Sequence, residues 1–204
     1  MVYIFLMIDQ RRSKGAKTRK KVLESAAHLF QQQGYAATSI NQIISTSGQP
    51  KGSLYFHFPG GKQEIAAAAA AQSSEIILAL IKEVFATSET LREAIEAVAT
   101  AFSNQLQASN YCDGCPISPL ATSSTGEVTV LQQSCAGAFD EWLAAIEAGL
   151  SAHGITTSEC SSLASLILSS VEGAILLSQA RHNTDALDGL PTSLAPLLDV
   201  QRDT

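Results

Sequence analysis

The chain has 204 residues, 46% hydrophobic and 16% charged, and its formal net charge of −6 argues against nucleic acid as a partner of the whole chain. A chain of this length can bury roughly 70% of its unfolded surface, so it can hold a core as one large domain or two small ones. Aromatic residues are few, at 6%, and alanine and leucine are abundant, which is typical of an all-helical protein.

The charge is unevenly distributed along the chain. Residues 1–62 carry nine Lys or Arg against two acidic residues, whereas residues 63–204 carry four against seventeen. The basic first part is therefore the candidate for contact with DNA. The alternative is an incidental basic tail, because a charge run is commonly only solvated surface.

Residues 1–14 are predicted to form an extension ahead of the first domain. The extension opens with seven apolar residues, too few to span a bilayer, which needs about 20. It also lacks the basic leader and cleavage site of a secretory signal. We expect a disordered segment or a start codon assigned too early, with Met7 as the true start. No other apolar stretch reaches membrane length without interruption, so we expect no membrane partner and a cytoplasmic protein.

A basic arm leads into the first predicted helix. Seven of the residues from Arg11 to Lys21 are basic, and such an arm can lie along phosphates or reach into a minor groove. The helix should continue to about Gln33 and close at Gly34. Its inward apolar stripe comprises Val22, Ala26, Leu29 and Phe30.

A short helix and a glycine turn come next. Ser39 and Gln42 have the spacing of a capping box, although Thr38 is an alternative cap. The helix should end before Gly48, because glycine readily takes the left-handed conformation that ends a helix. Its apolar face comprises Ile40, Ile43 and Ile44.

A second short helix, from Pro50 to about Phe56, is predicted after the turn. Proline suits a first helical position, since that amide would be unpaired anyway. A helix this short is not stable alone, so packing must hold it. Leu54 and Phe58 are the predicted anchors, and the three helices together suggest a DNA-binding helix-turn-helix.

The remaining side chains of this motif suit DNA. Gln49 and Lys51 can donate to base edges in a major groove, and Gly52 lets the backbone approach closely. A small helical hairpin with a polar face is the alternative. The residues expected to position phosphates are Thr38, Ser39, Ser53, Tyr55, His57 and Lys62.

These residues closely resemble the DNA-binding signature of the TetR family of bacterial transcriptional repressors. The resemblance spans about residues 15–66, and the Gln-Pro-Lys-Gly-Ser-Leu-Tyr variant with its extra glycine before Lys62 resembles the LmrA/YxaF-type branch. Two positions depart from the wider family. Pro50 lies where the family often has serine or threonine, and Gln49 lies where it usually has an apolar residue. The matching positions are Thr38-Ser39, Gly48, Lys51-Gly52-Ser53-Leu54-Tyr55, His57-Phe58 and Lys62.

The resemblance implies a fold and a function. It implies an all-α protein with a three-helix DNA-binding domain at residues 15–61 and a helical ligand-binding and dimerisation domain at residues 62–204. It further implies a repressor that binds a near-palindromic operator as a homodimer. By the same resemblance, a small hydrophobic or aromatic effector releases the protein from DNA, and no cofactor is expected.

A long connecting helix is predicted from about Lys62 to Ala86. Lys62 lies in its first turn, where free amides and the lysine charge attract phosphate. By resemblance to the family, the tilt of this helix transmits ligand binding to the DNA-binding domain. Turn residues divide the remainder into helices at about 90–108, 125–152, 157–182 and 192–202, with a broken stretch at 109–124.

The last two predicted helices are the candidate dimer interface, as the family also implies. The helix at 157–182 has little polar face, which suggests burial on more than one side. An ordinary core helix is the alternative. The apolar residues concerned are Leu163, Leu166, Ile167, Val171, Ile175 and Leu176, with Leu194, Leu197 and Leu198.

A regulatory ligand is expected among these helices. An apolar cavity with a few polar groups is the usual form of such a site. Plain core packing is the alternative for each residue separately. The candidate lining residues are Phe102, Leu106, Phe139, Trp142 and Leu176, with Gln105, Glu172 or Gln179 as the polar group.

Cys112 and Cys115 form a CxxC sequence in the broken stretch. In a cytosolic protein this pattern is more often redox-active or metal-binding than a structural disulfide. A second Cys or His pair at zinc-finger spacing is lacking, so we expect no metal site. A thiol switch that senses oxidants or electrophiles is the alternative function, and an unreactive loop is the simpler interpretation.

An enzyme is the competing class of protein. The four histidines lack a nucleophile or carboxylate at a recognisable catalytic spacing, and no phosphate-binding glycine loop, GxSxG or HExxH occurs. We therefore expect no catalytic residues. A DNA-packing protein without a ligand is a third class, which would bind DNA regardless of sequence.

Overall fold

The structure, a computed structural model, describes residues 2–123 and 129–198, with side chains from residue 15 onward except that of Thr157. Every regular element in the described residues is a helix, which confirms the predicted all-α class. The helices are α1 (Val2–Ala37), α2 (Ile40–Ser47), α3 (Lys51–His57), α4 (Gly61–Thr87), α5 (Leu91–Ala108), α6 (Ser118–Ala121), α7 (Val130–Ala152), α8 (Thr157–Arg181), α9 (Asp185–Asp188) and α10 (Leu190–Leu198).

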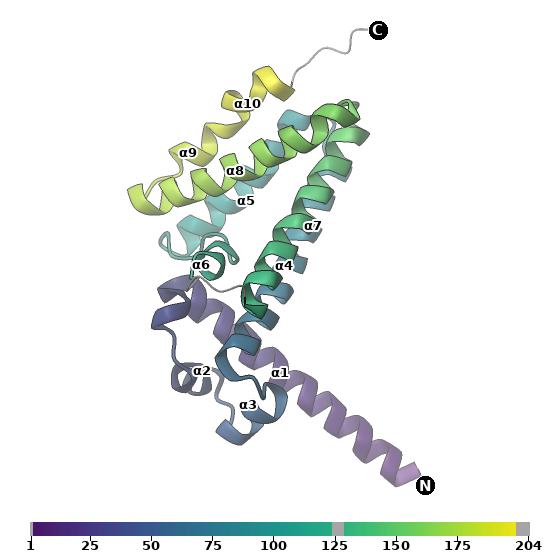
Figure 1. Ribbon diagram of the computed structural model, residues 1–204, viewed down its shortest axis with the longest axis vertical. Helices are drawn as coiled ribbons and strands as arrows, with labels where there is room; N and C mark the ends of the chain where they lie inside the picture. The colour runs from purple at the N-terminus through teal and green to yellow at the C-terminus, as the bar shows by residue number, and fades with distance from the viewer. Residues whose placement is uncertain (1, 124–128, 199–204) are drawn as a thin grey trace.

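The helices form two groups joined by one long helix (Figure 1). α1, α2 and α3 pack together at one end of the molecule, and α4 runs from there into the second group. α7 lies alongside α4, while α8, α9 and α10 pack on α5. The short α6 contacts α1 and lies where the two groups meet, so it is placed to connect them.

The boundaries of α1 differ from the prediction. Its backbone is helical from Val2, whereas the sequence favoured a separate extension over residues 1–14. Gly34, where the helix was predicted to close, has φ 78° and ψ 167° and interrupts the regular helix. A residue with a Cβ rarely adopts that conformation, so glycine permits the bend before α2.

α3 begins one residue later than predicted. Pro50 is its N-cap, with φ −60° and ψ 142°, and is not the first helical residue. The Pro50 carbonyl accepts hydrogen bonds from the amides of Ser53, at 2.9 Å, and Leu54, at 3.1 Å. Proline fits this position because its ring fixes φ near the observed value.

The second group differs from the prediction mainly at its breaks. The prediction lacked α6 and α9, which are single-turn helices. Thr129 caps α7, and the predicted start of that helix at Thr125 lies outside the described residues. α10 begins before the predicted Thr192, because Pro191 lies in its first turn, where no amide partner is needed. The predicted end at Arg202 also lies outside the described residues.

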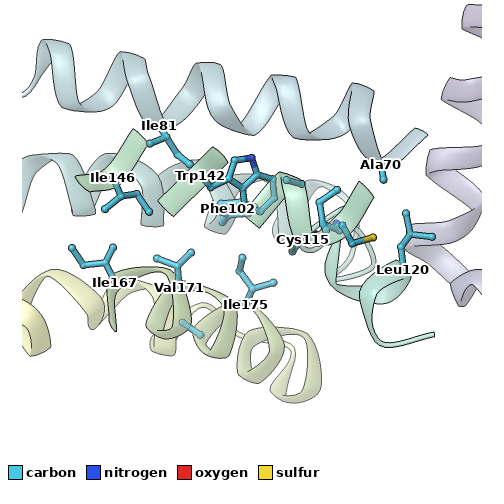
Figure 2. Close-up of a cluster of buried hydrophobic side chains, with 14 of the residues drawn as sticks. Ala70, Ile81, Phe102, Cys115, Leu120, Trp142, Ile146, Ile167, Val171 and Ile175 are labelled. Carbon is cyan, nitrogen blue, oxygen red and sulfur yellow. Dashed lines mark hydrogen bonds between the residues drawn. The ribbon is translucent and has the colours of Figure 1, made fainter. Parts of the chain in front are cut away.

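The core of the second group is built around Trp142. Its side chain is 1% exposed, and its Nε1 donates a hydrogen bond to the Ser74 carbonyl of α4 at 3.2 Å. Figure 2 shows Trp142 beside Phe102 of α5, with Ile167 and Val171 of α8 pointing toward both. Four helices therefore meet at one aromatic cluster.

α4 and α7 approach closely at Gly149. A Cβ at residue 149 would overlap the ring of Phe85 from α4. Phe85 also meets the His153 imidazole edge-on, with the ring centroids 6.1 Å apart. The absent side chain at residue 149 therefore allows the Phe85 ring to lie between the two helices.

Two of the helices, α4 and α8, are long and apolar enough to cross a membrane by length and composition alone. The sequence interpretation missed this, because each apolar stretch contains scattered polar residues. In the structure α4 contributes Ile65 and Ile81 to the core, and α8 contributes Ile167 and Ile175. Both helices are thus part of the folded core.

Candidate nucleic-acid interface and ligand cavities

The turn between α2 and α3 is fixed by its caps. The Ser39 amide donates to Gln42 Oε1 at 2.8 Å, and the Gln42 amide donates to Ser39 Oγ at 3.2 Å, which confirms the predicted capping box. Gly48 has φ 64°, and its amide donates to the Ile44 carbonyl at 3.1 Å. The left-handed glycine ends α2 and redirects the chain into α3.

α3 is held by two fully buried side chains, as predicted. Leu54 is 0% exposed and Phe58 is 1% exposed, and both belong to the core that includes Ile43 of α2. The Arg19 guanidinium of α1 lies over the Phe58 ring, 5.4 Å from its centroid. The same contact that holds α3 therefore places a cation of α1 beside it.

The exposed face of α3 has an aromatic residue that the sequence interpretation missed. At about 100° per residue, Gly52 and Phe56 lie opposite the buried Leu54. Phe56 is 81% exposed and the neighbouring Tyr55 is 40% exposed. The signal was present in the sequence, because Phe56 follows Leu54 by two positions and so cannot share its buried face.

Lys51 and Tyr55 form one flank of this face, and Ser53 and His57 form the other. Lys51 is exposed, whereas Ser53 and His57 are half-buried. The His57 ring stacks edge-on against Phe56, with centroids 5.2 Å apart. The α3 face, comprising Lys51, Gly52, Ser53, Tyr55, Phe56 and His57, is thus a continuous surface of polar and aromatic groups.

Thr38 does not belong to this surface, which corrects the prediction for that residue. Its side chain is 1% exposed, and its hydroxyl donates to the Gly34 carbonyl at 2.8 Å. The same oxygen accepts a hydrogen bond from Gln33 Nε2 at 3.1 Å. Thr38 therefore ties the end of α1 to the start of α2 and is not exposed to a phosphate.

Gln49 is turned toward its own loop. Its Nε2 donates to the Ser47 carbonyl at 3.2 Å, and the residue is half-buried. Its amide oxygen and its second N–H remain for a base edge, a combination that suits the amino group and N7 of adenine. Lys51 is the exposed donor next to it.

Lys62 lies in the first turn of α4, as predicted. Its Nζ lies 4.1 Å from the centroid of the Tyr35 ring, a cation–π contact that the sequence did not indicate. Partial burial lowers the pKa of the Lys62 ammonium and raises the pKa of the Tyr35 phenol. Tyr35 thus holds the lysine at the junction of α1, α3 and α4.

A small internal cavity adjoins the aromatic cluster. Its volume is about 40 Å³, and three of the predicted ligand residues, Phe102, Trp142 and Glu172, line it. The other lining residues are apolar. They are Ile77, Leu80, Ile81, Phe85, Ile95, Val98, Ile146, Ile167, Leu168 and Val171.

The other predicted ligand residues do not line this cavity. Leu106 is fully buried core, and Phe139 packs edge-on against Trp142 with centroids 5.4 Å apart. Gln105 Nε2 donates to the carbonyls of Asp113, at 2.8 Å, and Gly114, at 3.1 Å, so it fixes the loop after α5. The structure therefore brings together only part of the predicted set here.

Leu176 and Gln179 line a second, larger hollow, which we call the interdomain groove. Its volume is about 390 Å³, and Glu172 lines it as well. Its walls come from α1, the loop before α6, α6 itself and α8. The remaining lining residues are Gln31, Gly114, Cys115, Ser118, Pro119, Thr122, Gly173 and Ile175.

The two CxxC cysteines have different surroundings. Cys112 is exposed, whereas Cys115 is 4% exposed, and both are free thiols. Burial, with a smaller effect of the nearby Glu172 carboxylate, raises the pKa of Cys115 to about 12. A thiol with this pKa is protonated at neutral pH and reacts slowly, which weakens the thiol-switch alternative. Within the described residues no group of three His, Cys, Asp or Glu side chains is placed to hold a metal ion.

Comparison with known proteins identifies both parts of the chain. Residues 22–69 match the family described as bacterial regulatory proteins, tetR family. Residues 91–191 match the family described as transcriptional regulator LmrA/YxaF-like, C-terminal domain.

Individual relatives agree with the family matches. The HTH-type transcriptional regulator LmrA of Bacillus subtilis is 34% identical over 89% of this chain and 96% of its own length. YxaF of the same organism, an uncharacterized HTH-type transcriptional regulator, is 37% identical over 79% of this chain and 84% of its own length. The crystal structure of a TetR transcriptional regulator from Chloroflexus aurantiacus superposes with a TM-score of 0.76 at 27% identity, covering 93% of this chain and 98% of that one.

Proposed function

The chain belongs to the TetR family of bacterial transcriptional regulators, and we propose that it is a repressor that binds a near-palindromic operator as a homodimer. A small hydrophobic or aromatic effector bound in the carboxy-terminal domain releases it from DNA. The proposal divides the chain into a DNA-binding domain at residues 15–61 and an effector and dimer domain at residues 62–204. Like its relatives the protein is a regulator and not an enzyme, and we place it in the cytoplasm, where its DNA is.

The α3 face is the observation that carries the proposal. A short helix with two buried anchors presents Gly52 and Phe56 outward, so its backbone can approach the floor of a major groove. Lys51 donates to base edges, and Gln49 contributes through its side-chain amide. The groups assigned to phosphates are Ser39, Ser53, Tyr55, His57 and Lys62.

Dimerisation is supported by leucines left exposed on the second group of helices. Leu166 is 42% exposed and Leu177 is 45% exposed on α8, and Leu197 is 43% exposed on α10. A hollow of about 270 Å³ lies between residues of α8 and α10, and its lining is Ile155, Glu159, Ser162, Leu163, Leu166 and Leu197. Side chains from a second copy would fill this hollow and remove the leucines from water.

The effector part of the proposal is supported by the aromatic walls of the internal cavity. Phe102 and Trp142 provide stacking surfaces, and the rest of the lining is apolar except for Glu172. A drug-sized ligand needs roughly 300–1,000 Å³. A cavity of about 40 Å³ must therefore enlarge to admit one. Ile77, Leu80, Ile81 and Phe85 of α4 line it, so its enlargement would shift side chains of the connecting helix.

The experiment that tests DNA recognition is selection of binding sites from random DNA, followed by affinity measurements with variants. Lys51→Ala should cost about 1–3 kcal/mol on the selected operator and relax the base preference at one position. Lys82→Ala is the matched control, because it removes an exposed lysine from α4 within the effector domain. Equal losses in both variants, or no selected motif at all, would contradict the assignment of α3.

A further inference from the structure

Glu172 joins the two hollows described above. Of the residues that the structure describes, it alone lines both the internal cavity and the interdomain groove. Its Oε2 accepts a hydrogen bond from the Ser118 hydroxyl of α6. Across the described residues, no Lys, Arg or His side chain forms an ion pair with it. Glu172 is half-buried and has only a neutral hydrogen-bond donor. Burial disfavours an unpaired charge, so a cation placed beside this carboxylate would be stabilising.

Most of the side-chain donors that line the groove are already used within the protein. Thr122 Oγ1 donates to the Ser118 carbonyl at 2.9 Å, and the Ser118 hydroxyl donates to Glu172. Gln31 Nε2 donates to the Gly114 carbonyl at 3.2 Å, and Gln179 Nε2 donates to the Tyr111 and Cys112 carbonyls at 3.3 and 3.2 Å. The polar side-chain groups left for a ligand are therefore mostly acceptors, namely the Glu172 carboxylate and the amide oxygens of Gln31 and Gln179, beside one remaining N–H of Gln31.

We propose that the interdomain groove binds a small amphipathic amine, with its ammonium group on Glu172 and its apolar part over Pro119, Ile175 and Leu176. An ammonium supplies three donors and a positive charge, and so matches a site that offers acceptors and a carboxylate. An anionic or purely accepting ligand would leave Glu172 unsatisfied. The inference goes beyond the proposed function, because it adds a second ligand site in the groove to the effector site proposed for the internal cavity.

The groove also has the size and the location that an effector site needs. Its volume of about 390 Å³ falls within the usual range for ligand sites, whereas the internal cavity is far smaller. Gln31 is in α1 of the DNA-binding group, and its hydrogen bond to Gly114 crosses to the other group. A ligand that contacts Gln31, α6 and α8 together would change the angle between the groups directly.

The test uses three arylalkylamines, with phenyl, naphthyl and biphenyl groups, and the corresponding neutral alcohols. Calorimetric titration of the full-length protein should show that amines bind more tightly than their alcohols. Glu172→Gln keeps the size of the side chain and an acceptor for Ser118 but removes the charge. It should weaken amine binding about 10- to 100-fold, which corresponds to the loss of one hydrogen bond to a charged group. Alcohol binding should be unchanged.

A second pair of variants locates the site independently of Glu172. Gly173 lines the groove, and a Cβ there meets nothing within 4 Å, so a side chain can leave the backbone at this position and Gly173→Leu should occupy part of the groove. Gly137→Leu is the matched control, because Gly137 of α7 is equally unobstructed but is not among the residues that line the groove. Gly173→Leu should abolish amine binding and Gly137→Leu should preserve it, with the oligomeric state of both measured by light scattering.

Operator binding without any amine is measured in parallel for every variant. Loss of specific DNA binding in the unmodified protein would count against the proposed function, independently of the groove. Specific DNA binding combined with equal affinity for amines and alcohols, or with millimolar amines failing to bind, would overturn the amine site alone. Amine binding that survives both Glu172→Gln and Gly173→Leu would overturn it as well.

Discussion

Phe56 is the residue whose placement most changes the sequence-based description of the DNA-binding surface. The sequence interpretation assigned DNA contacts to polar groups, including the Tyr55 hydroxyl, treated Phe58 as an anchor and gave Phe56 no role. Phe58 is such an anchor, but Phe56 points the opposite way and is 81% exposed. The apolar group that a major groove offers is the thymine methyl, and aromatic side chains can contact it.

Phe56→Ala should therefore weaken operator binding by about 1–3 kcal/mol and reduce the preference for thymine at one position. The readout is the affinity for operators in which each thymine is replaced in turn by uracil, which lacks only the methyl group. Ile76→Ala is the control, since Ile76 of α4 is 65% exposed and far along the chain from α3. If replacement of thymine by uracil changed the affinity of the wild type and of Phe56→Ala equally, recognition of the methyl group by this side chain would be ruled out.

The cysteines allow a second prediction for single residues. Cys115, Cys135 and Cys160 are buried, and burial raises the pKa of Cys135 to about 11 and of Cys115 to about 12. In the native protein a disulfide reagent at neutral pH should modify Cys112 rapidly and the other three only after unfolding. Peroxide should leave operator binding of Cys112→Ser and Cys115→Ser the same as that of the wild type. Release of the wild type, but of neither variant, would restore the thiol switch.

The raised pKa of the Cys115 thiol also predicts how the stability of the fold depends on pH. Its folded pKa lies above the ordinary value of 9.0, so the folded state favours the protonated thiol. The stabilisation is fully present below about pH 9 and is lost as the pH rises toward the folded value of about 12. Cys115→Ala should therefore flatten the alkaline loss of stability, which denaturant titrations between pH 8 and pH 11 would measure.

Individual helices show which local signals in the sequence were sufficient. Capping boxes at Ser39 and Thr90 start α2 and α5 where they were expected, because each satisfies its own amides with neighbouring side chains. Gly34 and Gly48 interrupt the chain where they were expected, because both have positive φ. Such features depend on residues only a few positions apart.

The features that were missed depend on tertiary packing. α6 forms in a proline-containing loop whose Leu120 is 2% exposed, and α9 is held by Leu187, which is fully buried. The Tyr35–Lys62 contact joins residues from two helices, and no spacing rule predicts it. For the same reason, five of the eight predicted pocket residues line one or both of two separate hollows and three line neither, since helix periodicity assigns a face but not the neighbour that covers it.

Two glycines of α7 give a matched test of the contact between α4 and α7. Gly149→Ala should destabilise the protein by about 1–3 kcal/mol, because the new methyl group must displace the Phe85 ring. Gly137→Ala, in the same helix, meets nothing within 4 Å and should stabilise by up to about 1 kcal/mol. Urea unfolding of both variants would measure the difference, and equal effects would mean that α7 is not packed on Phe85 as described.

At the scale of the whole molecule, the chain combines a basic DNA-binding end with an acidic second part. The net charge of −6 hides this division, and only the distribution of charge pointed to DNA. The all-α class and the family followed from the sequence, while the groove between the two groups did not. The groove is formed by α1, α6 and α8, whose residues are far apart in the chain.

The proposed homodimer can be tested by placing a charge on its predicted interface. Leu166→Glu or Leu177→Glu should convert the protein to a monomer in sedimentation experiments, because each places a charge on the exposed leucine surface of α8. The monomer should lose most of its operator affinity, since one α3 reads only half of a near-palindrome. Val130→Glu is the control, since Val130 is 62% exposed at the start of α7. A Leu166→Glu protein that stays dimeric would place the interface elsewhere.

The most direct test of the account is binding of the purified protein to its own upstream intergenic DNA and to an unrelated fragment of equal length, across a series of salt concentrations. A sequence-specific repressor should keep its preference for the upstream fragment at physiological salt, because contacts with base edges persist when the phosphate contribution is screened. Equal binding to both fragments, lost together as salt rises, would show only phosphate contacts and would contradict sequence-specific recognition of the upstream DNA.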